Sequence, residues 1–313
     1  MTDELAIEAS GLVKSFGKAR VLDGLDLRVR RGSVYALLGE NGAGKTTTVR
    51  ILSTLSRPDG GQVRVAGFDV IRDRHEVRRA ISLTGQYAAL DEQQTGMENL
   101  RMMGRLSRLS RSAARSRANE LLAQFGLTEA ARKQVGAYSG GMRRRLDLAA
   151  SLVGRPSVIF LDEPSTGLDV HSRQAMWEVV TGLAGDGVTI FLTTQYLEEA
   201  DKLADRIAVL KGGRLVAEGS AAELKERVAG KRLDLRLASA EAFAILSGNL
   251  QGQPVHADPA ALTIGVATDG SAAGVRALLD QLDPGRTLVQ DFAVHGATLD
   301  DVFLALTQEL SHV

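Results

Sequence analysis

The segment Gly39-Glu40-Asn41-Gly42-Ala43-Gly44-Lys45-Thr46-Thr47 decides the fold of this chain. It follows a continuous apolar run over residues 34–38 and leads into a stretch with helical character over residues 46–55. A strand, a glycine-rich loop and a helix in this order are the context that a phosphate-binding loop requires. The sequence therefore predicts an α/β fold with a phosphate site where this strand ends.

The residue types in this loop match the Walker A pattern. Glycine lets the backbone come close enough for successive N–H groups to wrap the phosphates, and the following helix points its positive end at the anion. The Lys45 ammonium is expected to reach the β and γ phosphates of ATP, and the Thr46 hydroxyl to ligate Mg²⁺. An ordinary glycine-rich turn is the structural alternative. The predicted nucleotide-binding positions of the loop are Gly39, Asn41, Gly42, Gly44, Lys45, Thr46 and Thr47.

A second motif, Ser157-Val158-Ile159-Phe160-Leu161-Asp162-Glu163, matches the Walker B pattern. A buried apolar strand would deliver two adjacent carboxylates to its C-terminal end, where ligands bind in α/β sheets. Asp162 is expected to hold Mg²⁺, and Glu163 to orient and deprotonate the attacking water. Together the two motifs predict a nucleoside triphosphatase of the P-loop class, but they do not say which branch.

The segment Tyr138-Ser139-Gly140-Gly141-Met142 lies between those two motifs, at the start of a predicted helix over residues 143–153. Its simplest interpretation is a helix N-cap, because Ser139 with two glycines would serve that purpose alone. Its placement ahead of the Walker B strand, however, resembles the signature motif of ABC ATPases. The chain is therefore similar to an ABC nucleotide-binding subunit over about residues 5 to 225.

This resemblance implies a fold and a domain order. The implied fold is a P-loop NTPase core with an antiparallel β subdomain and a helical insert. The implied nucleotide-binding domain covers residues 1–225, with its helical subdomain at about 88–155. Strand-like and helix-like segments alternate over residues 226–313, which predicts a small C-terminal α+β accessory domain, with a split βαβ arrangement as one candidate.

Three further residues fall in the order of the family's motifs. Gln86 resembles the Q-loop glutamine, which implies that it senses the metal and the γ phosphate. Asp169, which ends the segment Ser165-Thr166-Gly167-Leu168-Asp169, resembles the D-loop aspartate and is placed among the nucleotide-binding residues. Phe16 lies where the family has an aromatic ring that stacks on adenine. Taken alone, Phe16 would be read as a core residue and Gln86 as a surface residue.

The resemblance also implies that two copies of the chain pack head to tail around ATP. The tip formed by Ser139, Gly140 and Gly141 in one copy would contact the γ phosphate that Lys45 of the other copy holds. A helix N-terminus with free amides is a suitable anion site. ATP and Mg²⁺ are thus the implied cofactors, and a second copy is an implied partner.

Two positions depart from the family pattern. Gln195 occupies the place of the switch histidine, and it is assigned a catalytic role beside Glu163 and Gln86. Its amide can donate to phosphate but cannot become cationic, so hydrolysis is expected to persist with little titration from this position. Met142 stands where the signature has glutamine, which removes one polar contact.

Composition limits the remaining partners. Lysine plus arginine and aspartate plus glutamate both number 38, and the resulting net charge of zero argues against a general nucleic-acid binder. The chain has no cysteine, which excludes disulfides and thiolate metal sites. No secretory signal and no apolar run of roughly 18 residues is visible. A transport role therefore requires a separate integral membrane permease, with this chain at the cytoplasmic face of the membrane.

The C-terminal pattern Leu299-Asp300-Asp301-Val302-Phe303-Leu304, together with Gln195, resembles subunits of the daunorubicin-resistance type of drug exporter. This resemblance implies ATP-driven efflux of a drug-like or hydrophobic compound. An amphipathic closing helix is the structural alternative for the pattern. For the whole chain, the alternatives are the ATPase subunit of an importer and a non-transport ABC ATPase that acts on ribosomes or DNA. The single Walker A motif and the lack of a long coiled coil argue against the second of these.

Overall fold

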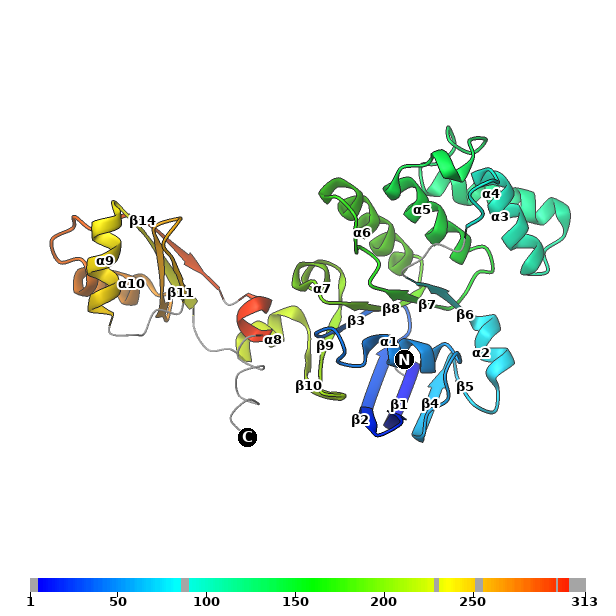
Figure 1. Ribbon diagram of the computed structural model, residues 1–313, viewed down its shortest axis with the longest axis horizontal. Coiled ribbons are helices and arrows are strands. Elements are labelled where there is room, and N and C mark those ends of the chain that lie inside the picture. Colours follow the sequence, from blue (N-terminus) through cyan, green and yellow to red (C-terminus); the bar gives the residue numbers. More distant parts are fainter. Residues whose placement is uncertain (1–4, 86–89, 228–230, 251–255, 297, 304–313) are drawn as a thin grey trace. The chain divides into compact units, whose positions relative to one another are not determined.

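The computed structural model describes residues 5–85, 90–227, 231–250, 256–296 and 298–303 (Figure 1). The chain divides into two compact units, Met1–Ala221 and Ala222–Val313. Each unit has an apolar core of its own. Among the described residues, no helix is both long enough and apolar enough to span a bilayer.

A six-stranded sheet forms the centre of the first unit. In spatial order its strands are β10 (Arg214–Gly219), β9 (Arg206–Lys211), β3 (Val34–Leu38), β8 (Thr189–Thr194), β7 (Val158–Asp162) and β6 (Ile81–Thr84). Only β10 is antiparallel to its neighbour, and the other pairs are parallel. Every residue of β3, β7 and β8 is buried, as expected for strands of a parallel sheet that is covered on both faces.

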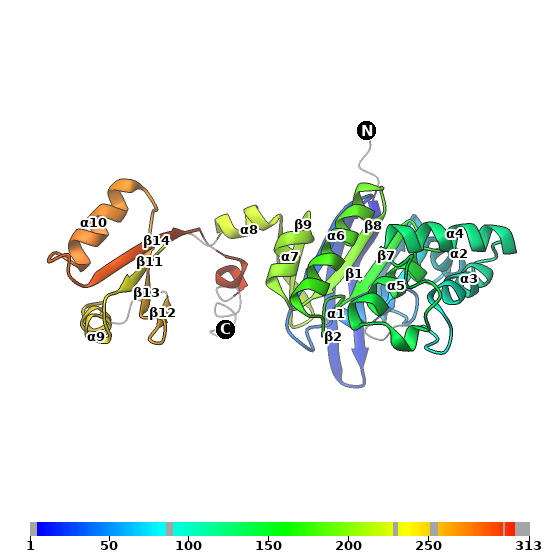
Figure 2. The ribbon, with the colours of Figure 1, turned by 90° about the horizontal axis from the view of Figure 1, so that it is seen from above.

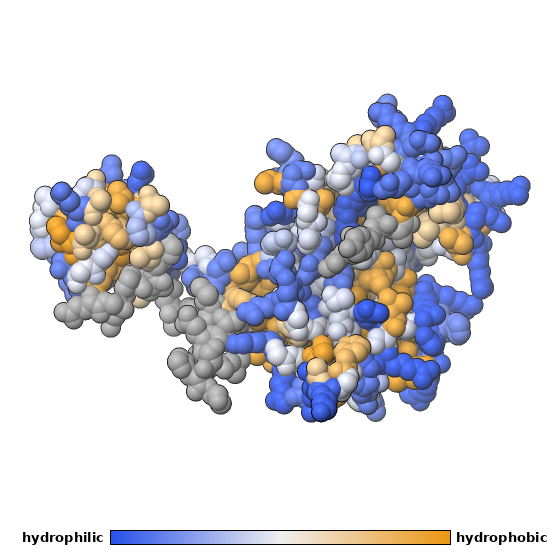
Figure 3. All heavy atoms as spheres, in the orientation of Figure 1, coloured by the Kyte–Doolittle hydropathy of each residue, from blue (hydrophilic) through white to orange (hydrophobic). Residues whose placement is uncertain are grey.

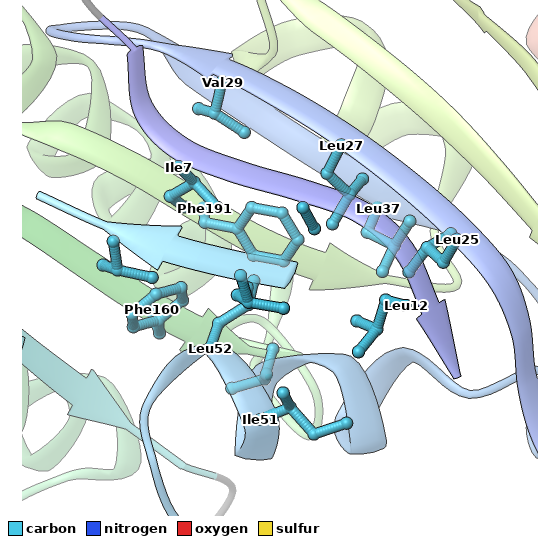
Figure 4. Close-up of a cluster of buried hydrophobic side chains, with 14 of the residues drawn as sticks. Ile7, Leu12, Leu25, Leu27, Val29, Leu37, Ile51, Leu52, Phe160 and Phe191 are labelled. Atoms are coloured by element: carbon cyan, nitrogen blue, oxygen red, sulfur yellow. The ribbon is translucent and has the colours of Figure 1, made fainter. Parts of the chain in front are cut away.

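A second, antiparallel sheet packs against this one through a shared core (Figure 4). Its strands, in spatial order, are β2 (Ala19–Arg30), β1 (Leu5–Phe16), β4 (Gly60–Val65) and β5 (Phe68–Asp69). Ile7 and Leu27 of this sheet meet Phe160 and Phe191 of the parallel sheet, and Ile51 of α1 (Lys45–Leu52) closes the cluster. The phosphate-loop helix is therefore fixed by apolar contacts on its far side.

The helix α1 is shorter at its C-terminal end than the apolar pattern predicts. It ends at Leu52 instead of continuing to residue 55. Thr54 takes a left-handed φ of 65°, which a continuing helix does not allow. The helix is still long enough to present its N-terminus to the loop and to bury Val49, Ile51 and Leu52.

The helical insert contains α3 (Gly96–Leu106), α4 (Arg111–Gln124) and α5 (Gly140–Ser151). Thr95 and Glu98 form a capping box at the start of α3, and Ser110 caps α4. The helical region expected here is interrupted between these two helices, where Arg108 has a φ of 64°. Hydrophilic side chains cover most of the insert in the view of Figure 3.

Further helices belong to the first unit or, in the case of α8, begin at its last residue. Two of them, α6 and α7, follow the strands β7 and β8 in the chain, so their starts lie near the carboxyl ends of these strands (Figure 1). The bounds are α2 (Arg74–Ala80), α6 (Val170–Gly185), α7 (Leu197–Leu203) and, at the border of the second unit, α8 (Ala221–Arg227).

The second unit contains β11 (Lys231–Leu237), α9 (Ala240–Asn249), β12 (His256–Asp258), β13 (Thr263–Thr268), α10 (Ala272–Leu282) and β14 (Val289–His295). Its sheet order is β12-β13-β11-β14, and all pairs are antiparallel. This order confirms the split βαβ arrangement expected from the sequence. Leu235 packs in one cluster with Leu246 of α9 and Val275 of α10, so both helices cover the same face of the sheet (Figure 2).

The C-terminal motif begins a helix over residues 299–303. Leu299 and Val302 are buried and Phe303 is half-buried, which is the pattern of an amphipathic helix. Leu304 lies outside the described residues. This burial agrees with the structural alternative, in which the motif is an amphipathic helix.

Phe191→Ala is expected to lower the free energy of unfolding by about 3–5 kcal/mol, because it removes a fully buried ring from the shared core. The Phe191 ring stacks on Tyr35 at 5.6 Å between centroids and lies 5.8 Å from Phe160. Urea unfolding followed by the fluorescence of Trp177, the single tryptophan of the chain, measures the stability of this unit.

The matched control is Phe68→Ala, which removes the same side chain where it is 38% exposed. It is expected to cost less than about 1.5 kcal/mol. Equal losses in the two variants would contradict the placement of Phe191 at the centre of the core.

Candidate functional site

The parallel sheet brings the predicted motifs together at the carboxyl ends of adjacent strands. The glycine loop follows β3, Gln195 follows β8, and Glu163 follows β7, in the spatial order β3-β8-β7. The Gly39 amide donates to the Thr194 carbonyl at 3.4 Å, so the loop is joined to the neighbouring strand at this edge. Segments far apart in the sequence thus form one site, in the usual ligand position of an α/β sheet.

Glycine is required at the end of the loop for two independent reasons. Gly44 precedes α1 with a φ of 112°, a backbone conformation that residues with a Cβ rarely adopt. A Cβ at this position would also lie 2.7 Å from Leu22 Cδ2 and 3.0 Å from the Val21 carbonyl oxygen. The antiparallel sheet therefore holds the loop tightly from behind. No side chain caps α1, which leaves the first amides of the helix for an anion.

Lys45 is buried within its own loop. Its Nζ donates to the Gly39 carbonyl at 2.7 Å and to the Glu40 carbonyl at 3.1 Å, and it lies 3.5 Å from Glu163 Oε1. The lysine of the Walker A motif and the glutamate of the Walker B motif are thus an ion pair across the site. These contacts fix the ammonium at the position where the loop turns.

Thr46 and Asp162 form the oxygen-donor part of the site. Thr46 Oγ1 and Asp162 Oδ1 are 3.3 Å apart, and the Asp162 carboxylate also accepts a 2.6 Å hydrogen bond from Thr193 Oγ1. A hydroxyl and a carboxylate are donors that suit Mg²⁺, which takes one or two protein oxygens and completes its shell with water and substrate phosphates. Thr193 orients the carboxylate, as an outer ligand partner does. This role of Thr193 was not predicted from the sequence, because a threonine in a buried strand carries no distinct signal.

Glu163 has an unusual backbone conformation. Its φ is 49°, and its amide donates to both the carbonyl oxygen and Oγ1 of Thr193, at 3.0 and 3.2 Å. A non-glycine residue in this region costs about 1–3 kcal/mol and persists only where its surroundings fix it. The turn directs the carboxylate back across the strand end, towards Lys45.

The signature segment is a helix start, as both of its interpretations require. Ser139 caps α5 and its hydroxyl accepts from the Met142 amide at 3.2 Å. A Cβ on Gly141 would lie 2.4 Å from Ser172 Oγ, whereas a Cβ on Gly140 would meet nothing within 4 Å. Gly141 is therefore in close contact with the first turn of α6, which follows the D-loop segment.

Asp169 caps that helix. Its carboxylate accepts from the Ser172 amide at 2.9 Å and from Ser172 Oγ at 2.7 Å. The hydrogen bond from the Ser172 amide lowers the pKa of the Asp169 carboxyl. Because Ser172 also contacts Gly141, the D-loop segment and the signature segment support each other within one chain.

The other predicted residues differ in their placement. Phe16 is 55% exposed, with Lys14 Nζ 5.2 Å from the centroid of its ring, so the core interpretation of this residue is wrong. Asn41 and Gln195 are exposed, and Thr47 is half-buried. Gln86 lies outside the described residues.

The signature segment is not joined to the phosphate loop of its own chain. Among the described residues, no hydrogen bond or ion pair connects Ser139, Gly140 or Gly141 with residues 39–47. The amides at the start of α1 and those at the start of α5 therefore form two separate groups in the chain. A glycine loop with its lysine after β3 and two carboxylates at the end of β7 together define a P-loop nucleoside triphosphatase.

Comparison with known proteins supports this class and identifies the family within it. A family model described as "ABC transporter" matches residues 22–166. The chain is 52% identical to the daunorubicin/doxorubicin resistance ATP-binding protein DrrA of Streptomyces peucetius, over 96% of this chain and 92% of that protein. It is 42% identical to the Nod factor export ATP-binding protein I of Ralstonia nicotianae, over 70% of this chain and 68% of that protein.

One solved structure is a dimeric ATP-binding cassette in a post-hydrolysis state, bound to ADP and Pi. It is 25% identical to this chain, with a TM-score of 0.61, and the match covers 68% of this chain and 98% of that one. On these relations the chain belongs to the ABC transporter family, in which it is an ATPase. The likeness to the daunorubicin-resistance type that the C-terminal pattern indicated is confirmed by the full-length match.

Gly141→Ala is expected to lower the free energy of unfolding by about 1–3 kcal/mol, because the new Cβ overlaps Ser172. Urea unfolding without nucleotide measures this effect and separates it from any effect on catalysis. The matched control, Gly140→Ala, has open space for its Cβ and is expected to be neutral or to stabilise by up to about 1 kcal/mol. A Gly141→Ala variant as stable as the control would show that the contact between α5 and α6 is not tight.

Proposed function

We propose that this chain is the ATP-hydrolysing subunit of an ABC exporter, which drives the efflux of a drug-like or hydrophobic compound through a separate membrane permease. The ion pair between Lys45 and Glu163, beside the Thr46–Asp162 oxygen pair, is the observation that carries the ATPase part. The assignment to drug export is supported by the similarity to a drug-resistance protein over both units of the chain.

The proposed chemistry is the in-line attack of water on the γ phosphate. Lys45 would neutralise phosphate charge, and its present contacts with Gly39 and Glu40 place its ammonium at the turn of the loop. Thr46 and Asp162 would hold Mg²⁺, which offsets the charge of the β and γ phosphates. Glu163 would orient the water and accept its proton as the bond to the leaving ADP breaks. Gln86 and the exposed Gln195 amide would contact the γ phosphate from the neighbouring strand ends.

A second copy of the chain would complete the site. The first amides of an α-helix have no partner within the helix, and among the described residues the Ser139 side chain accepts a hydrogen bond only from the amide of Met142. The amides at the start of α5, which include those of Gly140 and Gly141, can therefore donate hydrogen bonds to the γ phosphate held by Lys45 of the partner. Asp169 would lie at the same interface, since it shares Ser172 with Gly141. Phe16 would stack on the adenine, because its ring is exposed.

The partners and the domain roles follow from this assignment. Residues 1–225 would act as the nucleotide-binding domain, with residues 88–155 as its helical subdomain, and residues 226–313 as an accessory domain. The chain would work at the cytoplasmic face of the membrane, bound to an integral permease. No role in binding nucleic acid is proposed.

Glu163→Gln is expected to lower ATP turnover by at least about 100-fold while ATP still binds, because it removes the group that accepts the proton. The variant should then form an ATP-bound dimer on size-exclusion chromatography, whereas Lys45→Ala should lose both turnover and dimer. Glu178→Gln is the matched control, since Glu178 is an exposed residue of α6. In cells that also express the permease, daunorubicin should accumulate more with Glu163→Gln than with the native chain.

Two results would contradict the proposal. Undiminished turnover in Lys45→Ala would show that the glycine loop is not the phosphate site. A Glu163→Gln variant that binds ATP and stays monomeric would show that the signature segment does not reach a partner's nucleotide.

Gln195→His is expected to introduce a pH dependence that the native protein lacks. A glutamine amide does not titrate, so Gln195 adds no step to the pH profile of the native chain. Turnover by the native chain should therefore change by less than about threefold between pH 6 and 8. The imidazole of the variant, with an ordinary pKa of about 6.5, should add a step in that range. Steady-state ATPase assays across the range measure both profiles. A large step in the native profile, or inactivity of both proteins, would contradict the assigned role of Gln195.

A further inference from the structure

Arg144 is a buried arginine in the helix that the signature segment begins. It lies in α5 and is only 9% exposed. Its Nε donates to the Pro164 carbonyl at 3.0 Å, its Nη1 donates to the Gly85 carbonyl at 2.8 Å, and Nη1 lies 3.4 Å from Asp147 Oδ2. One planar side chain thus joins the signature helix to two loops at the edge of the parallel sheet.

Both carbonyls belong to segments that lead to the reacting groups. Pro164 directly follows Glu163, and Gly85 directly precedes Gln86. The contacts span 20 and 59 residues of sequence, so they are tertiary contacts and not consequences of local turns. The guanidinium is rigid, so the two carbonyl positions are fixed relative to each other and to α5.

The cost of burying this side chain argues against a role in stability alone. Burial lowers the pKa of Arg144, and the nearby carboxylate of Asp147 opposes this effect. Nη2 is buried and has no hydrogen-bond partner among the described residues. A buried cation with an unpaired nitrogen is unfavourable compared with an apolar side chain of similar volume.

The backbone of Glu163 needs such an anchor. A left-handed φ of 49° is not held by the residue's own preference. On the N-terminal side, the Glu163 amide is held by Thr193. On the C-terminal side, the carbonyl of the next residue, Pro164, is held by Arg144. The direction of the carboxylate therefore depends on both contacts.

We propose that Arg144 is a positioning residue for ATP hydrolysis: it orients Glu163 and the segment entering Gln86, and it ties both to the signature helix. It acts through backbone carbonyls and touches neither phosphate nor metal ligand. The inference rests on the proposed role of Glu163 as the residue that orients the attacking water. A movement of α5 would be transmitted to the Pro164 carbonyl beside Glu163 and to the Gly85 carbonyl together.

The adjacent arginines provide a control, because they point elsewhere. Arg143 pairs with the exposed Glu92 at 2.7 Å, and Arg145 Nη1 donates to the Phe125 carbonyl at 3.0 Å. Arg145→Gln therefore removes an arginine–carbonyl hydrogen bond of the same type from the same helix, away from the nucleotide loops.

In the full-length protein, Arg144→Gln is expected to lower kcat by at least about tenfold, while the ATP Kd and KM change by less than about threefold, because misplacement of a catalytic group affects the chemical step. Arg144→Lys should recover part of this loss, since one ammonium can reach one of the two carbonyls. Arg145→Gln should retain kcat within about twofold.

A double-mutant cycle with Glu163→Gln tests whether Arg144 acts through Glu163. If it does, Arg144→Gln should lower the residual turnover of the Glu163→Gln protein by less than about twofold, because there is no carboxylate left to orient. An undiminished tenfold loss in that background would overturn the proposal, as would an effect on KM alone. If Arg144→Gln fails to fold, the same two criteria apply to Arg144→Lys. If Glu163→Gln itself retains native turnover, the proposed role of Glu163 in hydrolysis is wrong. This result differs from those that contradict the role of Arg144 alone.

Discussion

The parallel pairing of β3, β8 and β7 is the constraint on which the site depends. Parallel strands end at the same edge, so the residues that follow these three strands are brought together although they are distant in sequence. The register of the two pairings places Leu38 opposite Thr194 and Asp162 opposite Thr193. A shift of one residue between β7 and β8 would separate the carboxylate of Asp162 from Thr193, and a shift in either pairing would separate it from Thr46.

The antiparallel sheet also shapes the site, because it packs directly against the glycine loop. Leu22 and Val21 of β2 lie so close to Gly44 that no side chain fits there, and the core contacts of α1 continue into the same sheet. The loop is thus clamped between two sheets before any phosphate arrives. Preorganised amides of this kind bind an anion without a further ordering cost, which is the physical advantage of a loop held from behind.

The residues that local patterns identify and those that they miss differ in kind. The glycine loop, the acidic pair after β7 and the serine–glycine helix start were found because each is a short segment with a chemical reason for its residue types. Thr193 and Arg144 were missed because their roles come from contacts across 31, 20 and 59 residues, and an arginine or a threonine has no distinct local pattern. The left-handed backbone of Glu163 likewise has no sequence signal, because the glutamate is held there by its surroundings.

The same distinction applies to the fold. The alternation of strands and helices was sufficient to propose the split βαβ order of the second unit, because each segment is short and amphipathic. It was not sufficient to place the break between α3 and α4, where Arg108 leaves the helix although arginine favours helices. The break is determined by Ser110, because its hydroxyl caps the next helix and offers the backbone an alternative hydrogen bond.

The charges of the site favour the proposed completion of the site by a second copy of the chain. Two of the three Lys45 donors already engage carbonyls, and the ammonium lies beside Glu163. A triphosphate that enters brings negative charge next to two carboxylates, so one lysine and the loop amides do not balance it. Mg²⁺, which Thr46 and Asp162 would hold, would supply part of the missing positive charge. The first amides of α5 could supply more, but among the described residues no hydrogen bond or ion pair joins Ser139, Gly140 or Gly141 to residues 39–47. In the proposed ATP-bound dimer, a second copy would bring its own helix start and so add positive charge beside the phosphate that Glu163 faces.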